Sequence, residues 1–330
     1  MAKAVVLGAT GHMGAHVVRA LLREGHEVRA AYRSEKFLSV LEKLPVERIK
    51  VDLETEEGLA EAVQGCSWVF YAAGYYPSSK ERNRAQVIEK ATQSARSVLR
   101  AIQRAQPTRV VFTSSAATIR PVTDRPAAEE DAETWPISGW RSLYSTAKIA
   151  MEQEALHAAQ EGMPIVIVNP SICVGEYDSR AFSGRILLVF AKNRVPWYVD
   201  TVVNVVYTGD VGVGHVRAAQ RGQIGQRYLL TGRNLTLKEF GTLVAQEAGT
   251  VPPRWKVPHF AAYAIGSAAE LWARGSRTDP LFTREEVRRA KGGYPLDGSK
   301  AFRELGMPQT STVEAIRRAL SWFKQRGYLS

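Results

Sequence analysis

Cysteine is scarce in this chain of 330 residues, and its scarcity excludes several kinds of site. Cys66 and Cys173 are the only two cysteines, and neither lies in a metal-ligand spacing. Such sparse usage fits a reducing compartment, so we expect a cytoplasmic protein without a bound metal. His12 and His16 lie one turn apart on an expected helix, but no acidic or cysteine third ligand accompanies them.

Long apolar runs are also absent. The best candidate for a membrane span, His259–Ala273, is too short and contains Glu270, so no membrane span is expected. The chain starts directly with a strand pattern, which argues against a signal peptide. No Gly-x-Ser-x-Gly sequence occurs, which leaves a serine hydrolase unsupported. With 45% hydrophobic and 23% charged residues, the composition is that of a globular protein.

Acidic residues are outnumbered by basic ones, 33 against 44, which gives a formal net charge of +11. Excess positive charge can attract nucleic acid, an anionic membrane surface or phosphate-bearing ligands. Basic residues gather late in the chain, at Arg284, Arg288, Arg289, Arg317 and Arg318. No basic run is interleaved with aromatic residues, so we predict solvated helix faces and no nucleic-acid partner.

Glycines mark the start of the chain. Residues 4–7 form an apolar run typical of a buried parallel strand, and Ala15–Glu24 has the apolar spacing of a helix. Between them, Gly8, Gly11 and Gly14 follow the spacing G-x-x-G-x-x-G. Such a strand–turn–helix unit places backbone and a helix N-terminus against a pyrophosphate. The stretch therefore predicts a dinucleotide-binding loop rather than an ordinary glycine-rich turn.

Strands alternate with helices up to about Gln220, which is typical of a parallel sheet with crossover helices. We therefore predict an α/β protein with a Rossmann-type doubly wound parallel sheet and a smaller, mostly helical substrate lobe. The dinucleotide-binding domain is expected over residues 1–170 and the substrate domain over residues 171–330. Residues 202–221 are expected to return to the sheet, and the lobe to roof the crevice beyond the strand ends.

The later glycine-rich stretch Gly209–Gly214 is expected to open a helix with Asp210 as its N-cap. The further strands expected are Glu27–Tyr32, Arg48–Asp52, Trp68–Ala73, Arg109–Ser115, Ile165–Asn169 and Val202–Tyr207. The further helices expected are Asn83–Gln106 and Ser142–Glu161. The later segments expected to be irregular or helical are Phe182–Asn193, Thr236–Ala248, Phe260–Ala273, Thr283–Ala290 and Thr312–Gln325.

Tyr144 and Lys148 lie four residues apart in the expected helix Ser142–Glu161, which puts them on one face. A lysine ammonium beside a phenol favours the phenolate, so Tyr144 becomes a usable acid for an alkoxide that forms as hydride arrives. A serine at the end of the strand Arg109–Ser115 can hold the same oxygen. With the glycine loop, this favours a catalytic pair over a solvated surface pair.

The same Tyr-x-x-x-Lys spacing occurs twice more, at Tyr32/Lys36 and Tyr76/Lys80. Tyr32 ends a strand, where side chains four residues apart do not stack. Pro77 disfavours a helix at Tyr76. The spacing alone is therefore weak evidence, and only the third pair combines a helix with a preceding strand that ends in serines.

Together these motifs resemble the extended short-chain dehydrogenase/reductases over nearly all 330 residues. The glycine loop, residues 52–53, residues 72–74, residues 113–115 and the Tyr144/Lys148 pair occur in family order. Within that family, the chain is similar to the dihydroflavonol-reductase-like branch and to bacterial hopanoid-associated members described as sugar epimerases or reductases. The stretches that carry this closer similarity are residues 168–171, 198–201 and 319–329.

The resemblance implies a role for each residue of the site. Ser115 would polarise the carbonyl, Tyr144 would act as acid and base, and Lys148 would hold the nicotinamide ribose. Including the loop and its neighbours, the residues expected at the cofactor are Gly8, Thr10, Gly11, His12, Met13, Gly14, Arg33, Lys36, Asp52, Leu53, Ala72, Ala73, Gly74, Thr113, Tyr144, Lys148, Pro170 and Ser171.

The chain departs from the family pattern in two places. Many extended members carry an asparagine that supports the catalytic lysine through water, where this chain has Ala91. Ser94 or a water would have to substitute. The stretch Val168–Gly175 lacks the Arg-x-x-Asn-Val-Tyr-Gly pattern of sugar-nucleotide epimerases, which weakens that assignment.

The residues after the strand Glu27–Tyr32 indicate which nicotinamide cofactor binds. An acidic residue there would hydrogen-bond the ribose 2′-hydroxyl of NAD, whereas a basic one accommodates the 2′-phosphate of NADP. Arg33 and Lys36 follow the strand, with no acid before Glu35. Arg33 can contact a phosphate bidentately, so we predict NADP(H), with NAD as the alternative.

The leading hypothesis is an NADP(H)-dependent oxidoreductase that passes hydride between the nicotinamide and a carbonyl or secondary alcohol. The alternatives are a sugar-nucleotide epimerase or dehydratase that retains NAD(P), and a non-catalytic cofactor sensor or scaffold. The substrate is expected to be a small molecule, bulky and partly apolar, bound to a monomer or homodimer. Candidate walls of its pocket are Tyr75, Tyr76, Pro77, Trp135, Trp140, Phe182, Arg185, Trp197 and Tyr198.

Overall fold

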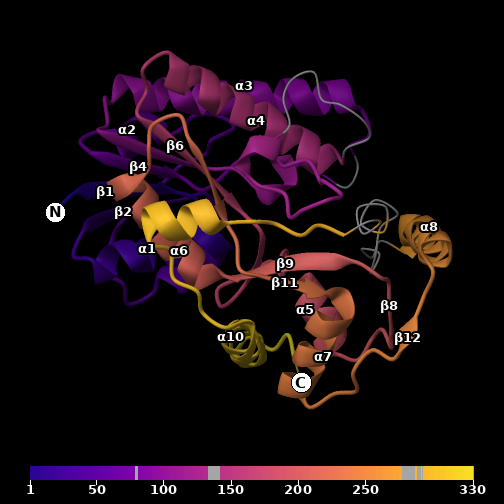
Figure 1. Ribbon diagram of the computed structural model, residues 1–330. Helices are drawn as coiled ribbons and strands as arrows, with labels where there is room; N and C mark the ends of the chain where they lie inside the picture. The colour runs from indigo at the N-terminus through magenta and orange to yellow at the C-terminus, as the bar shows by residue number, and fades with distance from the viewer. Residues whose placement is uncertain (79–80, 133–141, 277–286, 288–290, 292, 330) are drawn as a thin grey trace.

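A seven-stranded parallel sheet forms the centre of the molecule, in the order β10-β6-β5-β4-β1-β2-β3. The computed structural model describes residues 1–78, 81–132, 142–276, 287, 291 and 293–329 (Figure 1). The strands of the sheet are β1 (Lys3–Leu7), β2 (Glu27–Tyr32), β3 (Glu47–Lys50), β4 (Trp68–Tyr71), β5 (Arg109–Thr113), β6 (Ile165–Pro170) and β10 (Arg227–Leu230).

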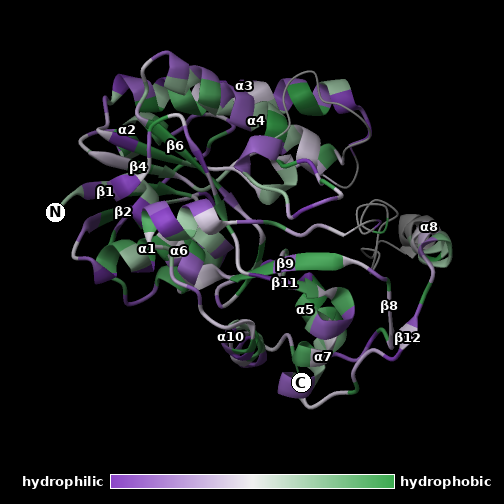
Figure 2. Ribbon diagram, in the orientation of Figure 1, coloured by the Kyte–Doolittle hydropathy of each residue, from purple (hydrophilic) through white to green (hydrophobic). Residues whose placement is uncertain are grey.

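Helices cover both faces of the sheet. On one face α1 (His12–Arg23) packs against α6 (Thr208–Arg221), and on the other α3 (Arg84–Arg104) packs against α4 (Leu143–Gln160). The central strands β1, β4, β5 and β6 are apolar and buried on both sides, so they supply two apolar cores (Figure 2). This confirms the predicted doubly wound α/β fold. The shorter helical segments are α2 (Leu59–Val63), η1 (Glu35–Leu41), η2 (Ala116–Thr118), η3 (Glu129–Asp131) and η4 (Ala301–Leu305).

Most of the chain after residue 171, apart from α6, β10 and η4, builds a smaller lobe at the carboxyl ends of the strands. Its own apolar core lies between a three-stranded sheet, in the order β11-β9-β7, and three helices. A two-stranded pair and one further helix form its outer end. The elements of the lobe are β7 (Ile172–Val174), α5 (Arg185–Ala191), β8 (Trp197–Tyr198), β9 (Val202–Tyr207), β11 (Arg233–Thr236), α7 (Leu237–Ala248), β12 (Trp255–Lys256), α8 (His259–Ser276) and α10 (Thr312–Gln325).

One strand lies where the sequence did not place it. The expected return of Val202–Tyr207 to the main sheet is wrong, because β9 pairs with β7 and β11. Val205 faces the core of the lobe and Val206 the core beside α1, so β9 is buried on both sides like a central strand. The seventh strand of the main sheet is β10, which was not expected. Residues 208–221 do lie on the sheet, as α6.

Two helices begin earlier than expected. α1 starts at His12 because Gly11 takes the N-cap position. α6 starts at Thr208, so Asp210 lies in its first turn and does not cap it. The Asp210 carboxylate instead accepts the backbone N–H of Thr310 at 2.6 Å.

One expected segment, Thr283–Ala290, lies outside the described residues except for residue 287.

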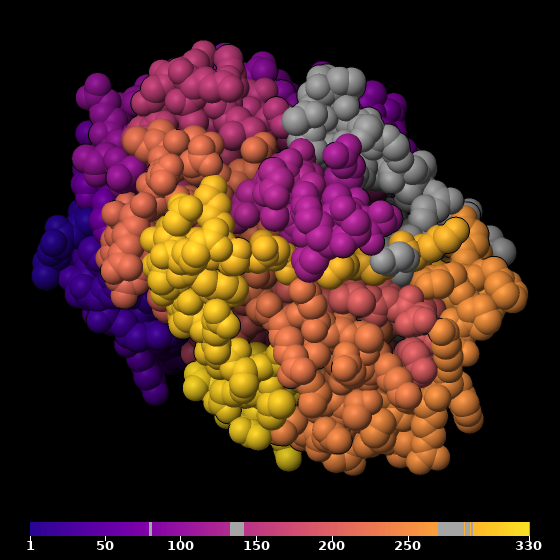
Figure 3. All heavy atoms as spheres, in the orientation of Figure 1, coloured from indigo at the N-terminus to yellow at the C-terminus, as the bar shows by residue number. Residues whose placement is uncertain are grey.

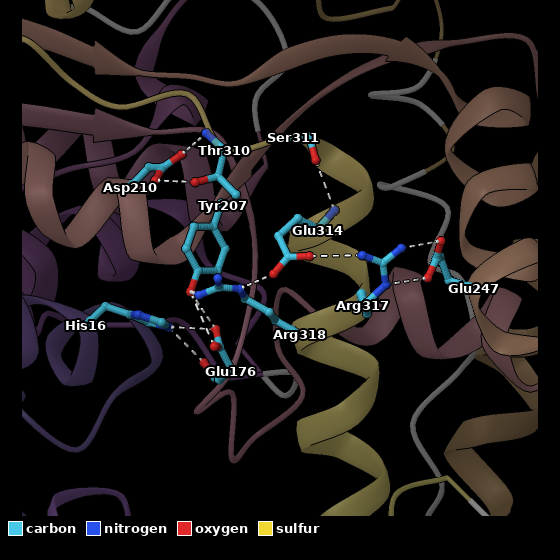
Figure 4. A network of polar contacts seen from close by, with 10 residues as sticks. All are labelled: His16, Glu176, Tyr207, Asp210, Glu247, Thr310, Ser311, Glu314, Arg317 and Arg318. Carbon is cyan, nitrogen blue, oxygen red and sulfur yellow. Dashed lines mark hydrogen bonds and ion pairs between the residues drawn. The ribbon is translucent and has the colours of Figure 1, made fainter.

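A chain of polar contacts joins the helix after the glycine loop to the last helix of the lobe (Figure 4). The imidazole Nε2 of His16 lies 3.1 Å from the carbonyl oxygen of Glu176. Tyr207 donates its hydroxyl to the Glu176 carboxylate at 3.0 Å, and Arg318 donates to that hydroxyl at 3.1 Å. Arg318 also pairs with Glu314 at 2.7 Å. The lobe is therefore anchored directly to α1.

Candidate active site

The glycine loop is a site where backbone segments meet with no room for side chains. Gly8 has a φ of +89°, and a Cβ there would lie 2.9 Å from the Cβ of Ala73 after β4. A Cβ on Gly14 would lie only 2.2 Å from the carbonyl oxygen of Gly8. The first and third glycines thus allow β1, α1 and the end of β4 to approach closely.

The start of α1 offers hydrogen-bond donors. The Gly11 N–H closes the turn on the Gly8 carbonyl at 2.9 Å. The N–H groups of His12, Met13 and Gly14 lie in the first helical turn, where helix geometry gives them no intrahelical acceptor. Positive partial charge at this end of a 12-residue helix favours a phosphate. The residues present therefore fit the pyrophosphate of a dinucleotide.

The imidazole of His12 has its own side-chain neighbours. Its Nε2 lies 2.9 Å from the Thr208 hydroxyl, and its Nδ1 lies 3.9 Å from the Asp178 carboxylate. Burial lowers the pKa of His12, and the charges of Asp178 and Glu176 oppose this only in part. A contact of His12 with a pyrophosphate would therefore come from its backbone N–H.

Tyr144 and Lys148 occupy the first two turns of α4, whose N-cap is Ser142. Lys148 is only 2% exposed, and its ammonium donates to the carbonyl oxygen of Thr113, the last residue of β5, at 3.5 Å. Burial lowers the pKa of Lys148, while the neighbouring Tyr144 and Glu152 act to raise it. The pair therefore stands at the carboxyl end of the central strands, on the same edge as the glycine loop.

Aromatic rings continue the surface beside Tyr144. The ring of Tyr76 stacks on Tyr144 with centroids 5.7 Å apart, and the ammonium of Lys148 lies 5.0 Å from the Tyr76 centroid. Phe182 approaches both rings, at 5.6 Å from Tyr76 and 6.3 Å from Tyr144. Phe182 is 66% exposed, so this aromatic surface is open to solvent.

The other residues expected to line the substrate pocket lie in different parts of the molecule. Tyr75 donates its hydroxyl to Glu81 at 2.6 Å, close to Tyr76 in the chain. Trp197 and Tyr198 form β8, which pairs with β12 in the outer part of the lobe. Arg185 starts α5. Trp135 and Trp140 lie outside the described residues.

Ser115 follows β5 and caps the short helix η2. Its hydroxyl oxygen accepts the backbone N–H of Ala117 at 3.1 Å, and no described residue accepts its hydroxyl hydrogen. That hydrogen is therefore available to a ligand at the sheet edge. The carbonyl oxygen of Ser115 accepts the Thr118 hydroxyl at 2.9 Å and the Asn169 amide at 3.3 Å, which fixes the backbone.

A buried polar network lies behind the serine, and its residues were not singled out from the sequence. Glu152, 1% exposed, accepts the Asn169 amide at 2.7 Å and the Thr118 hydroxyl at 3.1 Å. Arg227 of β10 pairs with the other oxygen of Glu152 at 2.6 Å. Glu152 lies one helical turn after Lys148, and this spacing could have pointed to it.

Ala91 lies in the apolar core between α3 and α4 and offers no polar atom to Lys148. Ser94, the suggested substitute, lies beside the buried phenol of Tyr71. The described charges that act on Lys148 come from Tyr144 and Glu152.

Two of the residues expected around the adenine end of the cofactor, Arg33 and Lys36, are exposed to solvent. Arg33, 56% exposed, pairs with Glu54 at 3.1 Å. Lys36 lies in η1, just beyond. The Asp52 carboxylate accepts the N–H of Glu54 at 2.8 Å, and Leu53 packs against the core beside α3.

At the other end, Pro170 closes β6, and Ser171 donates its N–H to the carbonyl of Leu230 at 3.2 Å. The Ser171 hydroxyl is buried without a hydrogen-bond partner among the described residues. A buried hydroxyl of this kind is expected to find its partner in a ligand or a water. Its position therefore fits the expected nicotinamide end of the site.

His215 on α6 contacts the side chain of Thr113 at the end of β5. It is fully buried, with Nε2 2.9 Å from the Thr113 hydroxyl and Nδ1 2.7 Å from the carbonyl of Val211. Burial lowers the pKa of His215 from 6.5 to about 4. The imidazole of His215 is therefore neutral in the folded protein at neutral pH.

This burial predicts a loss of stability in mild acid. Below pH 6.5 unfolded chains protonate His215 while the folded protein does not, so its contribution is complete above pH 6.5 and is lost as the pH falls to about 4. We expect His215 alone to remove about 3 kcal/mol of unfolding free energy across this range. Urea denaturation from pH 7 to 4 measures it.

His215→Gln should flatten this pH profile, whereas His157→Gln, at an exposed position on α4, should leave it unchanged. A profile identical in His215→Gln and the unaltered protein would contradict the prediction.

The glycine loop at the carboxyl edge of a doubly wound sheet, with a tyrosine–lysine pair beside it, defines a Rossmann-type dinucleotide-binding protein. The sequence profile of the NAD dependent epimerase/dehydratase family matches residues 4–230. The chain belongs to this family, which confirms the resemblance to the extended short-chain dehydrogenase/reductases. Its relatives are named as reductases and epimerases, so it is an enzyme of the NAD(P)-dependent oxidoreductase class.

Similar proteins span the full chain. A Synechocystis protein provisionally named dihydroflavonol 4-reductase is 33% identical, over 98% of this chain and 95% of its own. Sterol demethylase protein B of Methylococcus capsulatus is 31% identical, over 98% and 99%. The solved structure of a nucleoside-diphosphate-sugar epimerase from Pseudomonas aeruginosa is 28% identical and covers 100% of this chain and 99% of its own, with a TM-score of 0.80.

Two kinds of feature are absent from the described residues. No helix in that part of the chain has the length and apolarity needed to cross a membrane. Within the same residues, no group of three or more histidine, cysteine or acidic side chains is arranged to hold a metal ion.

Proposed function

We propose that the protein is an NADP(H)-dependent oxidoreductase that transfers hydride between the nicotinamide and a carbonyl or secondary alcohol. The observation that carries this proposal is the pair Tyr144 and Lys148, a phenol beside a buried ammonium at the edge of the sheet that also holds the glycine loop. A relative named as a reductase supports the redox direction.

Each polar group of the site has one task in this reaction. The bound nicotinamide supplies or accepts the hydride. Ser115 donates its hydroxyl hydrogen to the substrate oxygen and orients it. Tyr144 gives its proton to that oxygen during reduction and takes it back during oxidation. Lys148 holds the nicotinamide ribose, and its charge favours the phenolate of Tyr144.

The open rings of Tyr76 and Phe182 beside Tyr144 support a bulky, partly apolar substrate. The names of two relatives, which refer to a dihydroflavonol and a sterol, are consistent with this size and polarity. The direct test is loss of NADPH absorbance with a panel of ketones and aldehydes. Polycyclic or aryl ketones should be reduced with a higher kcat/KM than short aliphatic ones, and no turnover across the panel would reject the proposal.

A second candidate is a sugar-nucleotide epimerase or dehydratase with retained NAD(P). It is favoured by the family profile and by the name of the Pseudomonas aeruginosa relative. The two candidates differ in how the cofactor is held. A reductase releases NADP⁺ each turnover, so gel filtration should yield protein free of nicotinamide. An epimerase would retain it and would form isomers without net oxidation.

NADP preference is expected to depend on Arg33. Removing a charge-assisted phosphate contact costs about 1.5–3 kcal/mol, so Arg33→Ala should weaken NADPH binding about ten- to a hundredfold. NADH, which lacks the 2′-phosphate, should bind nearly as before. Fluorescence titration with both cofactors measures the two dissociation constants.

The matched control is Glu54→Gln. It removes the present ion-pair partner of Arg33 and should leave NADPH binding equal or tighter. Tighter binding of NADH than of NADPH by the unaltered protein would defeat the assignment.

A further inference from the structure

Exposed large apolar side chains gather at the outer end of the small lobe. Val251, Trp255, Phe260 and Ile265 are 47%, 65%, 80% and 44% exposed. They lie within fifteen consecutive residues, on β12, the start of α8 and the loop before them. Such a concentration on a folded protein marks an interaction surface rather than scattered surface residues.

Over residues 260–269, whose side chains the structure describes, the exposed positions of α8 lack the polar residues that a surface helix normally presents. Its inner side packs through Ala262 against Val199, with Val257 beside them. On the other side, side chains four residues apart form one stripe, and every one of them is apolar. The exposed residues from 260 to 269 are Phe260, Ala264, Ile265 and Ala268. With Trp255 they make up what we call the lobe-tip patch.

Basic residues flank the tryptophan of the lobe-tip patch. From Gly249 to Ala269 the chain has no acidic residue, while Arg254 and Lys256 flank Trp255. Arg254 is exposed, and no described residue pairs with its guanidinium. Lys256 pairs with Asp200 at 2.6 Å on the surface. The whole chain carries a net charge of +11.

We propose that the lobe-tip patch docks on the surface of an anionic lipid bilayer. β12 and α8 stand at the rim of the lobe, away from the seven-stranded sheet (Figures 1 and 3). Apolar side chains of an interfacial helix enter the headgroup boundary, and basic residues beside it meet lipid phosphates. The helix lies on the bilayer and does not cross it, in keeping with its length and apolarity.

A second copy of the chain fits this surface less well. A two-fold contact through the lobe-tip patch would bring two Arg254 side chains together and join two molecules that each carry +11. An anionic bilayer would instead attract the Arg254 side chain and the net positive charge of the protein. The proposal does not depend on the proposed function, because membrane binding is measured without substrate or cofactor.

The test is co-sedimentation of the full-length protein with vesicles. We expect binding to vesicles of two parts phosphatidylcholine and one part phosphatidylglycerol, and much weaker binding to pure phosphatidylcholine or at high salt. The double variant Phe260→Ser, Ile265→Ser should partition about tenfold less. Arg254→Glu should weaken binding to the anionic vesicles only.

Ile224→Ser is the matched control, because Ile224 is 52% exposed in the loop before β10, away from the lobe tip. Circular dichroism melts verify that each variant folds. Equal partition of the double variant and the control would overturn the proposal. So would light scattering that shows a dimer broken by the double variant, with no vesicle binding by the unaltered protein.

Discussion

Tyr144→Phe is expected to lower kcat for carbonyl reduction about a hundred- to ten-thousandfold, the usual contribution of a general acid. The variant keeps the ring that stacks on Tyr76 and loses only the hydroxyl. NADPH should therefore bind as before, since Lys148 and the glycine loop remain. Steady-state kinetics on any substrate found in the carbonyl panel, with a cofactor titration beside it, measures both quantities.

Tyr75→Phe is the matched control for this variant. It removes a nearby phenol that donates to Glu81 and does not belong to the pair on α4. We expect it to keep most of the activity. If Tyr144→Phe retained more than about a tenth of kcat, the role of Tyr144 as proton donor would be wrong.

Glu152→Ala is expected to destabilise the fold by about 3–5 kcal/mol, because it leaves the guanidinium of Arg227 and the amide of Asn169 without their buried partner. The double variant Glu152→Met, Arg227→Met should lose less than the single one, because no unpaired charge then remains. Urea denaturation of the three proteins measures the differences in unfolding free energy.

Two residues further along α4, Glu154 provides a surface comparison. It pairs with Arg96 at 2.8 Å, and the Arg96 side chain is half exposed. Glu154→Ala should therefore cost about 0–1 kcal/mol. If Glu152→Ala lost as little unfolding free energy as a surface ion pair, about 0–1 kcal/mol, the network behind Ser115 would not support the fold.

Local sequence patterns were sufficient for the doubly wound sheet and for the family. The glycine loop, the strand Glu27–Tyr32 and the last helix Thr312–Gln325 lie where periodicity put them, because each depends on residues close in the chain. Tyr144 and Lys148 are one helical turn apart, so helix geometry alone was enough to bring them together.

Contacts between distant segments could not be predicted. β9 is buried on both faces because it lies between two cores, and an apolar run does not reveal which sheet a strand joins. The Glu152 network depends on Arg227, 75 residues away in the chain. The contact of His215 with Thr113 spans 102 residues. The domain boundary at residue 170 and the role of each site residue stay predictions.

The most direct test of the central claim is a crystal structure of the protein with NADP⁺. We predict the pyrophosphate at the N-terminus of α1, Lys148 within hydrogen-bond distance of the nicotinamide ribose, and the Tyr144 hydroxyl facing the nicotinamide ring. A dinucleotide bound elsewhere, or a nicotinamide ring remote from Tyr144, would contradict it.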